Sequence, residues 1–203
     1  MKTVVAAPED LWEELSTTIK MVECVRVSDP VEFYQFSGDA VFFNLCEGAE
    51  KLTYPEGDLV FINSVSHTLN KNPQHQNVCR INAWKGFLKR DKWEIAGKID
   101  ARLQDYCASI EKQILAAPDV AGFVSSRILS MIINEAYFAL EEGVSTKSEI
   151  DTAMKLGTNY PKGPFEWSKE IGLKKVHELL EVLSKDDPRY TPAPLLIKES
   201  EEL

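Results

Sequence analysis

The stretch Gly157-Thr-Asn-Tyr-Pro-Lys-Gly-Pro-Phe-Glu166 decides how the second part of this 203-residue chain folds. Gly157 is a residue type that stops helices, and Gly163-Pro164 is a pair that opens one, because proline fits the first helical turn. The stretch therefore predicts the junction between a short helix over Ile150–Leu156 and another over Phe165–Glu170. One helix follows another here with only a turn between them.

The same helical character extends outward on both sides. A further helix is predicted over Leu173–Leu183, and Asp186-Asp187-Pro188 ends it, leaving an irregular proline-bearing tail. Upstream, a long helix that Gly143 can end carries an apolar stripe at helical spacing: Phe123, Ile128, Met131, Ile132, Ala136 and Leu140. The break at Ala116-Ala117-Pro118-Asp119 separates this part from the rest, so residues 118–203 are predicted to form an all-helical domain.

Residues 1–117 alternate short β-rich runs with helical ones and predict a compact α/β domain. Five strands are expected, and their apolar residues are continuous rather than alternating, which is typical of parallel strands buried on both faces: Thr3–Ala7, Val22–Val27, Ala40–Leu45, Leu59–Asn63 and Val78–Ile81. Helices are expected over Pro8–Ile19 and from about Asp100 to Leu115. The predicted fold class is therefore a truncated Rossmann-like α/β domain followed by an all-α domain.

The composition excludes several functions. The chain carries 23 Lys+Arg against 32 Asp+Glu, a net charge of −9, and nucleic-acid binding needs clustered cations. Its apolar runs are far shorter than the ~20 residues that span a bilayer, so no membrane insertion is expected. The N-terminal apolar run is too short for a secretion signal, and the four cysteines have neither zinc-site nor disulfide-framework spacing. We expect a cytoplasmic protein without a metal.

The helical part resembles a known family over about 80 residues. The motifs Gly122-Phe123-Val124, Ile133-Asn134-Glu135-Ala136, Ile150-Asp151-x-Ala153-Met154 and Gly163-Pro164-Phe165-Glu166 occur in order, followed by Pro188-Arg189-Tyr190-x-Pro192-x-Pro194. Together they resemble the C-terminal domain of 3-hydroxyacyl-CoA dehydrogenases, enzymes of fatty-acid metabolism. The resemblance implies that this domain pairs two subunits into a homodimer and completes an acyl-substrate cleft.

The resemblance also implies that the first part is a remnant of the family's NAD domain. The run Val41-Phe42-Phe43 through Cys46-Glu47 is similar to a strand and turn that carry a glutamate beside the cofactor, which assigns Glu47 to cofactor binding. The family's catalytic base is a histidine held by a glutamate twelve residues later. At the matching positions this chain has Asn82 and Glu94, and an amide cannot take up a proton near neutral pH.

Other family positions are altered as well. The family's serine maps to Val65, beside Ser66, and its asparagine at the start of the long helix maps to Ser126. A dinucleotide fold needs Gly-x-Gly-x-x-Gly after its first strand, whereas this chain has Ala6-Ala7-Pro8-Glu9-Asp10. Asp29 imitates the acidic residue that binds the adenosine ribose, but it also fits an ordinary turn. No cofactor is expected, and NAD is expected only if the family's function survives.

Three functions stay open, and with them whether the chain is an enzyme. The first is a degenerate relative, a pseudoenzyme that binds acyl-CoA without NAD-dependent turnover, with Lys89 and Arg90 contacting the CoA phosphates. The second is an active dehydrogenase with a displaced base, for which His67 and Glu47 are candidates. The third is a non-catalytic dimerisation module that regulates a full-length relative.

Overall fold

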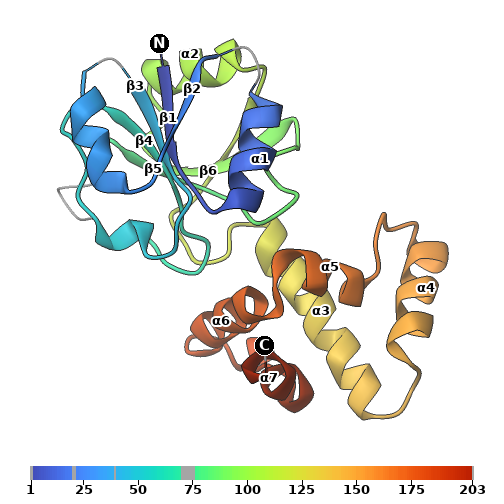
Figure 1. Ribbon diagram of the computed structural model, residues 1–203. Coiled ribbons are helices and arrows are strands. Elements are labelled where there is room, and N and C mark those ends of the chain that lie inside the picture. The colour runs from blue at the N-terminus through green and yellow to red at the C-terminus, as the bar shows by residue number, and fades with distance from the viewer. Residues whose placement is uncertain (1, 20–21, 39, 70–75, 203) are drawn as a thin grey trace. The chain divides into compact units, whose positions relative to one another are not determined.

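In the computed structural model of the chain, the described residues are 2–19, 22–38, 40–69 and 76–202. Two compact units follow one another, Met1–Phe123 and Val124–Leu203 (Figure 1). The division falls six residues after the expected boundary at residue 117, since residues 118–123 belong to the first unit. Asp119 is tied into that unit, where its carboxylate accepts the Leu69 amide and the Arg80 guanidinium.

The first unit is built on a seven-stranded sheet in the order β2-β1-β3-β4-β5-β6-β7. Strands β1 to β5 are mutually parallel, β6 is antiparallel to β5, and β7 is parallel to β6. Their bounds are β1 (Lys2–Ala6), β2 (Cys24–Val27), β3 (Ala40–Asn44), β4 (Leu59–Asn63), β5 (Val78–Ile81), β6 (Lys92–Gly97) and β7 (Gln113–Ala117). The five predicted strands are therefore present.

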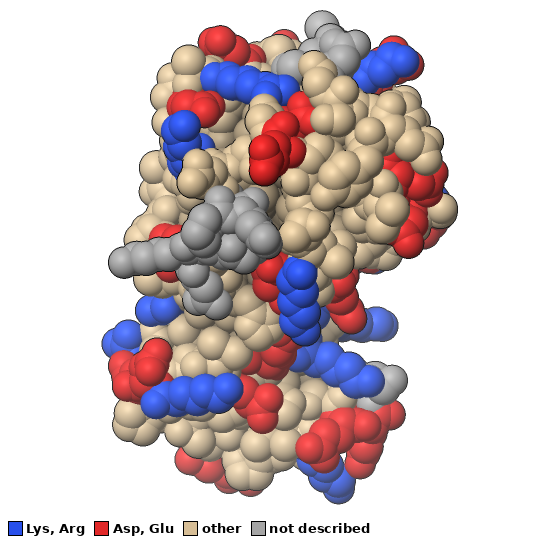
Figure 2. Space-filling model, turned by 90° about the vertical axis from the view of Figure 1, so that its left-hand side faces the viewer, with Lys and Arg blue, Asp and Glu red and all other residues tan. Residues whose placement is uncertain are grey.

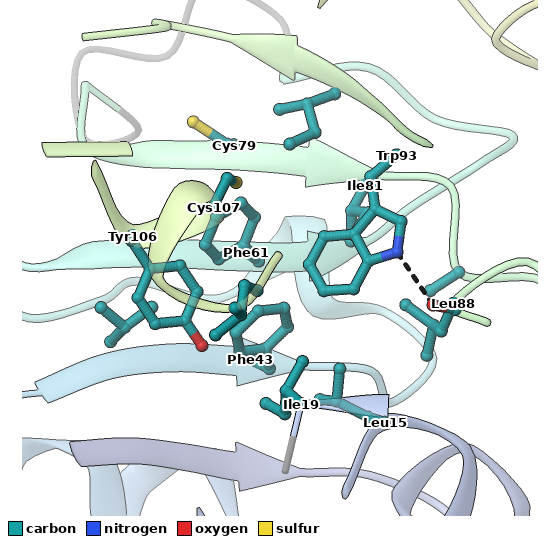
Figure 3. Packing of buried hydrophobic residues seen from close by; sticks show 14 of the residues in the cluster. Leu15, Ile19, Phe43, Phe61, Cys79, Ile81, Leu88, Trp93, Tyr106 and Cys107 are labelled. Carbon is teal, nitrogen blue, oxygen red and sulfur yellow. Dashed lines mark hydrogen bonds between the residues drawn. The ribbon is translucent and has the colours of Figure 1, made fainter. Parts of the chain in front are cut away.

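Both faces of the central strands are covered, which explains their continuous apolar runs. On one face, helices α1 (Glu9–Thr18) and α2 (Ala101–Ser109) enclose an aromatic core (Figure 3) in which the Phe43 and Phe61 rings stack at 4.6 Å. Trp93 joins this core and donates its indole N–H to the Leu88 carbonyl at 2.9 Å. On the other face, the short helices η1 (Pro30–Phe36) and η2 (Ala49–Lys51) supply Phe33 and Ala49.

The predicted helix over residues 100–115 is wrong in its second half. Helix α2 ends at Ser109, Glu111 adopts a positive φ of 58°, and the chain then enters β7. Ile114 still packs against the same core as Leu103, but it does so from a strand. The apolar spacing imitated a helix because both elements face one core. Strand β6 was also not predicted.

The second unit is helical, as expected. Its helices are α3 (Ser125–Glu141), α4 (Lys147–Thr158), α5 (Pro164–Ile171), α6 (Leu173–Ser184) and α7 (Pro194–Glu201), with the short helix η4 (Pro188–Tyr190) before α7. Helix α4 begins earlier than predicted because Thr146 caps it in a capping box with Glu149, and it continues past Gly157 to a left-handed Asn159.

The tail beyond residue 188 was expected to be irregular, but it contains α7. Asn134 in α3 holds the tail in place through two hydrogen bonds. Its Nδ2 donates to the Thr191 carbonyl at 2.9 Å, and its Oδ1 accepts from the Ala193 backbone amide at 2.8 Å. Pro194 then opens α7 at its first position. The prolines that suggested irregularity therefore start helices.

The apolar stripe predicted on α3 contributes only Ala136 to the buried face of that helix. That face consists of Ser126, Leu129, Ser130, Ile133, Asn134, Ala136 and Tyr137. Of the predicted stripe, Ile128 is 57% exposed, and Met131, Ile132 and Leu140 are partly exposed. An apolar surface therefore remains on the outer side of this helix.

Within the described residues, no helix combines the length and hydropathy needed to cross a membrane. On the face drawn in Figure 2, basic and acidic side chains alternate, and the described residues there form no continuous basic surface.

Candidate functional site at the carboxyl edge of the sheet

The carboxyl ends of β4 and β5 bring several predicted site residues to one edge of the sheet. These strands pair in parallel, with Asn63 opposite Ile81, so the residues that follow them leave the sheet on the same side. Ser64–Ser66 follow β4, and Asn82 follows β5. In α/β folds, ligands bind outside this edge, so it is the natural place to look for a site.

Asn82 and Glu94 lie in direct contact. The Asn82 Nδ2 donates to Glu94 Oε2 at 2.8 Å, and the Asn82 backbone amide donates to the Glu94 carbonyl at 3.1 Å. The antiparallel pairing of β5 with β6 places the two residues opposite each other, twelve positions apart in sequence. Both are buried, at 3% and 8% exposed.

The amide of Asn82 is held in one orientation. A carboxylate only accepts hydrogen bonds, so the Nδ2 group must face Glu94 and the Oδ1 must face away. Among the described residues, that Oδ1 has no hydrogen-bond donor. The pair therefore presents a buried acceptor and contains no imidazole.

The serines at this edge are buried, but the candidate histidine is not. Ser66 is 7% exposed, while the Ser64 hydroxyl donates to the His67 carbonyl at 3.1 Å. The His67 side chain is exposed. Ser126 lies in the other unit, fully buried in the first turn of α3, and its Oγ has no partner among the described residues.

The turn after β1 does not fit a dinucleotide. Pro8 caps α1 without a side-chain hydrogen bond, and Glu9 and Asp10 occupy the first helical turn, where they would repel phosphate. Arg26 bonds to Glu9 at 2.6 Å and to the Ala7 carbonyl at 3.1 Å, so its charge is already paired at this turn. No glycine allows a pyrophosphate to approach the backbone.

Asp29 and Glu47, the two acidic residues assigned to cofactor binding, do not adjoin a turn that could bind a pyrophosphate. Asp29 caps η1, accepting the Val31 amide at 2.8 Å, and Glu32 completes the capping box. Glu47 is exposed after β3. Asp29 therefore performs the local structural role that its position before a proline suggested.

Lys89 and Arg90 lie on the loop that follows Asn82, and a buried carboxylate organises this loop. Glu14 of α1, 5% exposed, accepts the Gly86 amide at 2.8 Å and the Lys89 amide at 3.3 Å. The side chains of Lys89 and Arg90 are exposed, and the Arg90 guanidinium lies 3.6 Å from the centroid of the Phe87 ring. Glu14 thus holds the backbone of the loop that carries these two exposed cations.

Sequence reasoning missed Arg80, a fully buried arginine on β5. Its Nε donates to the Ser64 carbonyl at 2.7 Å, and its guanidinium also reaches the Val65 carbonyl at 3.1 Å and the Asp119 carboxylate at 2.5 Å. Burial lowers the pKa of Arg80, and Asp119 opposes that shift. The available signal was a lone charge inside the apolar run Val78–Ile81.

Known proteins match this chain most clearly in its helical unit. Residues 122–202 match the family described as 3-hydroxyacyl-CoA dehydrogenase, C-terminal domain. A 3-hydroxybutyryl-CoA dehydrogenase of Bradyrhizobium diazoefficiens is 40% identical over 97 residues, which are 47% of this chain and 33% of that protein. A 3-hydroxyadipyl-CoA dehydrogenase of Escherichia coli is 44% identical over 87 residues, 42% of this chain and 18% of that protein. The matches span a third or less of these relatives.

Solved structures extend the likeness to the whole chain at the level of the fold. The (S)-3-hydroxybutyryl-CoA dehydrogenase of Ralstonia eutropha superposes with a TM-score of 0.72 at 19% identity, covering 98% of this chain and 93% of that one. A 3-hydroxybutyryl-CoA dehydrogenase of Escherichia coli superposes with a TM-score of 0.58 at 30% identity, covering 72% and 32%. The fold is that of a 3-hydroxyacyl-CoA dehydrogenase. The family match itself covers residues 122–202, which are less than half of this chain.

Proposed function

We propose that this protein binds acyl-CoA, as a 3-hydroxyacyl-CoA dehydrogenase relative, and does not oxidise it with NAD on its own. The observation that carries the proposal is the bond between Asn82 Nδ2 and Glu94 Oε2. Oxidation of a secondary alcohol requires a base for the hydroxyl proton, and a carboxamide donating to a carboxylate supplies none at neutral pH.

The turn after β1 supports the second half of the proposal. NAD binding in a Rossmann-type domain relies on glycines and free backbone N–H groups beneath the pyrophosphate. Here Pro8 lacks an N–H, and the salt bridge between Arg26 and Glu9 lies beside the turn. NAD, which would accept the hydride from the alcohol carbon, is therefore not expected to bind.

Calorimetry on the full chain tests this function. We expect 3-hydroxybutyryl-CoA to bind, NAD not to bind, and no NADH to form when both are present. The double variant Lys89→Ala/Arg90→Ala is expected to weaken acyl-CoA binding about tenfold, since each exposed contact to a phosphate contributes roughly 0.5–1 kcal/mol. The matched control Lys174→Ala/Lys175→Ala removes two cations from α6 and is expected to leave binding unchanged.

Two outcomes would replace the proposal. NADH formation that is lost in His67→Ala or Glu47→Gln would establish an active dehydrogenase with a displaced base. The absence of any CoA affinity would leave a non-catalytic dimerisation module.

We further propose that the chain forms a homodimer through its helical unit. Four large apolar side chains of that unit are exposed: Val124 at 57%, Ile128 at 57%, Val144 at 68% and Leu156 at 82%. Val124 and Ile128 lie one turn apart at the start of α3, and exposed apolar patches mark protein interfaces. Light scattering at micromolar concentration should give twice the 22.9 kDa chain mass. Ile128→Glu should yield monomers, and a monomeric wild-type protein would contradict the proposal.

A further inference from the structure

The buried Oδ1 of Asn82 points to a specific kind of ligand. Asn82 is 3% exposed, and a buried acceptor that has no donor among the described residues costs about 1–3 kcal/mol unless a bound molecule donates to it. The neighbouring Asn63 shows the contrast, because its Oδ1 accepts the Ala83 amide at 3.3 Å. Two asparagines thus end adjacent strands, and only one of them has its acceptor occupied within the described chain.

The orientation of the Asn82 amide cannot reverse while Glu94 is ionised. A reversed amide would place Oδ1 against the Glu94 carboxylate, two acceptors at the 2.8 Å now occupied by a hydrogen bond. The site therefore offers an acceptor and not a donor at this position. A hydroxyl group satisfies it, and a ketone oxygen, which only accepts, is repelled.

We propose that Asn82 makes the site selective for 3-hydroxyacyl thioesters over the corresponding 3-ketoacyl thioesters, a property that rests on the proposed acyl-CoA binding. Asn82 then acts as a specificity-determining residue that holds the 3-hydroxyl group through its Oδ1. The protein retains the reduced ligand and releases the oxidised one, with no proton transfer at Asn82.

The test compares 3-hydroxybutyryl-CoA with acetoacetyl-CoA by calorimetry on the full chain. We expect the hydroxy form to bind at least about tenfold tighter, because an unmatched buried acceptor is worth about that factor. In Asn82→Leu, which removes the acceptor at similar volume, the ratio should fall to about one. The control Asn77→Ala alters an amide that donates to the Pro55 and Asp58 carbonyls at the opposite edge of the sheet, and it should keep the ratio.

A second variant tests the orientation without enlarging the site. Glu94→Gln provides an amide N–H that can donate to Asn82 Oδ1, which frees Nδ2 to face the ligand as a donor. The carboxamide oxygen introduced at position 94 can also still accept from Nδ2, so both orientations of the Asn82 amide become available and the preference for the hydroxy form should weaken. Equal binding of both ligands by the wild type, or an unchanged ratio in both Asn82→Leu and Glu94→Gln, would overturn the inference and leave acyl-CoA binding intact. If neither ligand binds, the proposed function fails and the inference fails with it.

Discussion

Removing the Asp119 carboxylate is expected to destabilise the sheet unit strongly, because the buried Arg80 guanidinium would lose its counter-ion. The Arg80 side chain is fully buried, and Asp119 Oδ1 lies 2.5 Å from its guanidinium. The same carboxylate accepts the Leu69 amide at 3.0 Å. Asp119→Ala removes both interactions and leaves the Arg80 guanidinium with the backbone carbonyls of Ser64, Val65 and Val120 and with the face of the Phe123 ring, none of which carries a negative charge.

The magnitude follows from burial. Breaking a fully buried ion pair on one side costs about 3–5 kcal/mol, and the 31% exposure of Asp119 reduces that figure because water screens the remaining charge. We therefore take about 2 kcal/mol for the pair and add about 1 kcal/mol for the Leu69 hydrogen bond. With a urea m-value of about 2 kcal/mol/M, the expected loss of about 3 kcal/mol lowers the unfolding midpoint by roughly 1.5 M.

Urea unfolding followed by tryptophan fluorescence reports on this unit, which contains Trp12, Trp84 and Trp93. The double variant Asp119→Ala/Arg80→Met should lose at least about 1 kcal/mol less unfolding free energy than the sum of the two single variants, because no unpaired buried charge remains. The exposed pair of Lys2 and Glu23, 3.8 Å apart, provides a control: Glu23→Ala should change stability by less than about 0.5 kcal/mol. A similarly small effect of Asp119→Ala would refute the reasoning.

Two further predictions concern the helical unit. Gly163→Ala should destabilise it by about 1–3 kcal/mol, because a Cβ there would overlap Asp151, whereas Gly157→Ala faces open space and should stabilise α4 by up to about 1 kcal/mol; equal melting temperatures of the two variants would contradict this. Burial raises the pKa of Glu199, but hydrogen bonds from Lys147 and Tyr137 outweigh it and hold that pKa below the ordinary 4.5. This stabilisation is present above pH 4.5 and is lost as the pH falls through the lower folded value, so Lys147→Met should flatten the acid limb of the stability profile, and an unchanged limb would count against it.

The sequence predicted the parts of the fold that periodicity and apolar runs control. Strand β3 reads as a continuous apolar run because both of its faces are covered, and that pattern admits few alternatives. Strand β7 was mistaken for the end of a helix, since Leu103 and Ile114 face one core from different elements. No local pattern distinguishes that case, because the strand depends on pairing with β6.

The site divides in a similar way. The contact between Asn82 and Glu94 could be anticipated from the resemblance, because the family holds its histidine with a glutamate twelve residues later; the antiparallel pairing of β5 with β6 that places the two residues opposite each other was not predicted. The ties made by Arg80 to Asp119, 39 residues apart, and by Glu14 to the amide of Gly86, 72 residues apart, could not be anticipated. Nothing in a single sequence pairs residues so distant when neither belongs to a recognised motif.

We propose that this chain lacks both the catalytic base and the glycine-rich turn that would bind NAD, so restoring the base alone should not restore catalysis. The most direct measurement is NADH formation from 3-hydroxybutyryl-CoA and NAD by Asn82→His, assayed beside the wild type at high enzyme concentration. We predict no NADH from either protein, because the turn Ala6–Asp10 still excludes the dinucleotide. Turnover by Asn82→His would contradict the account.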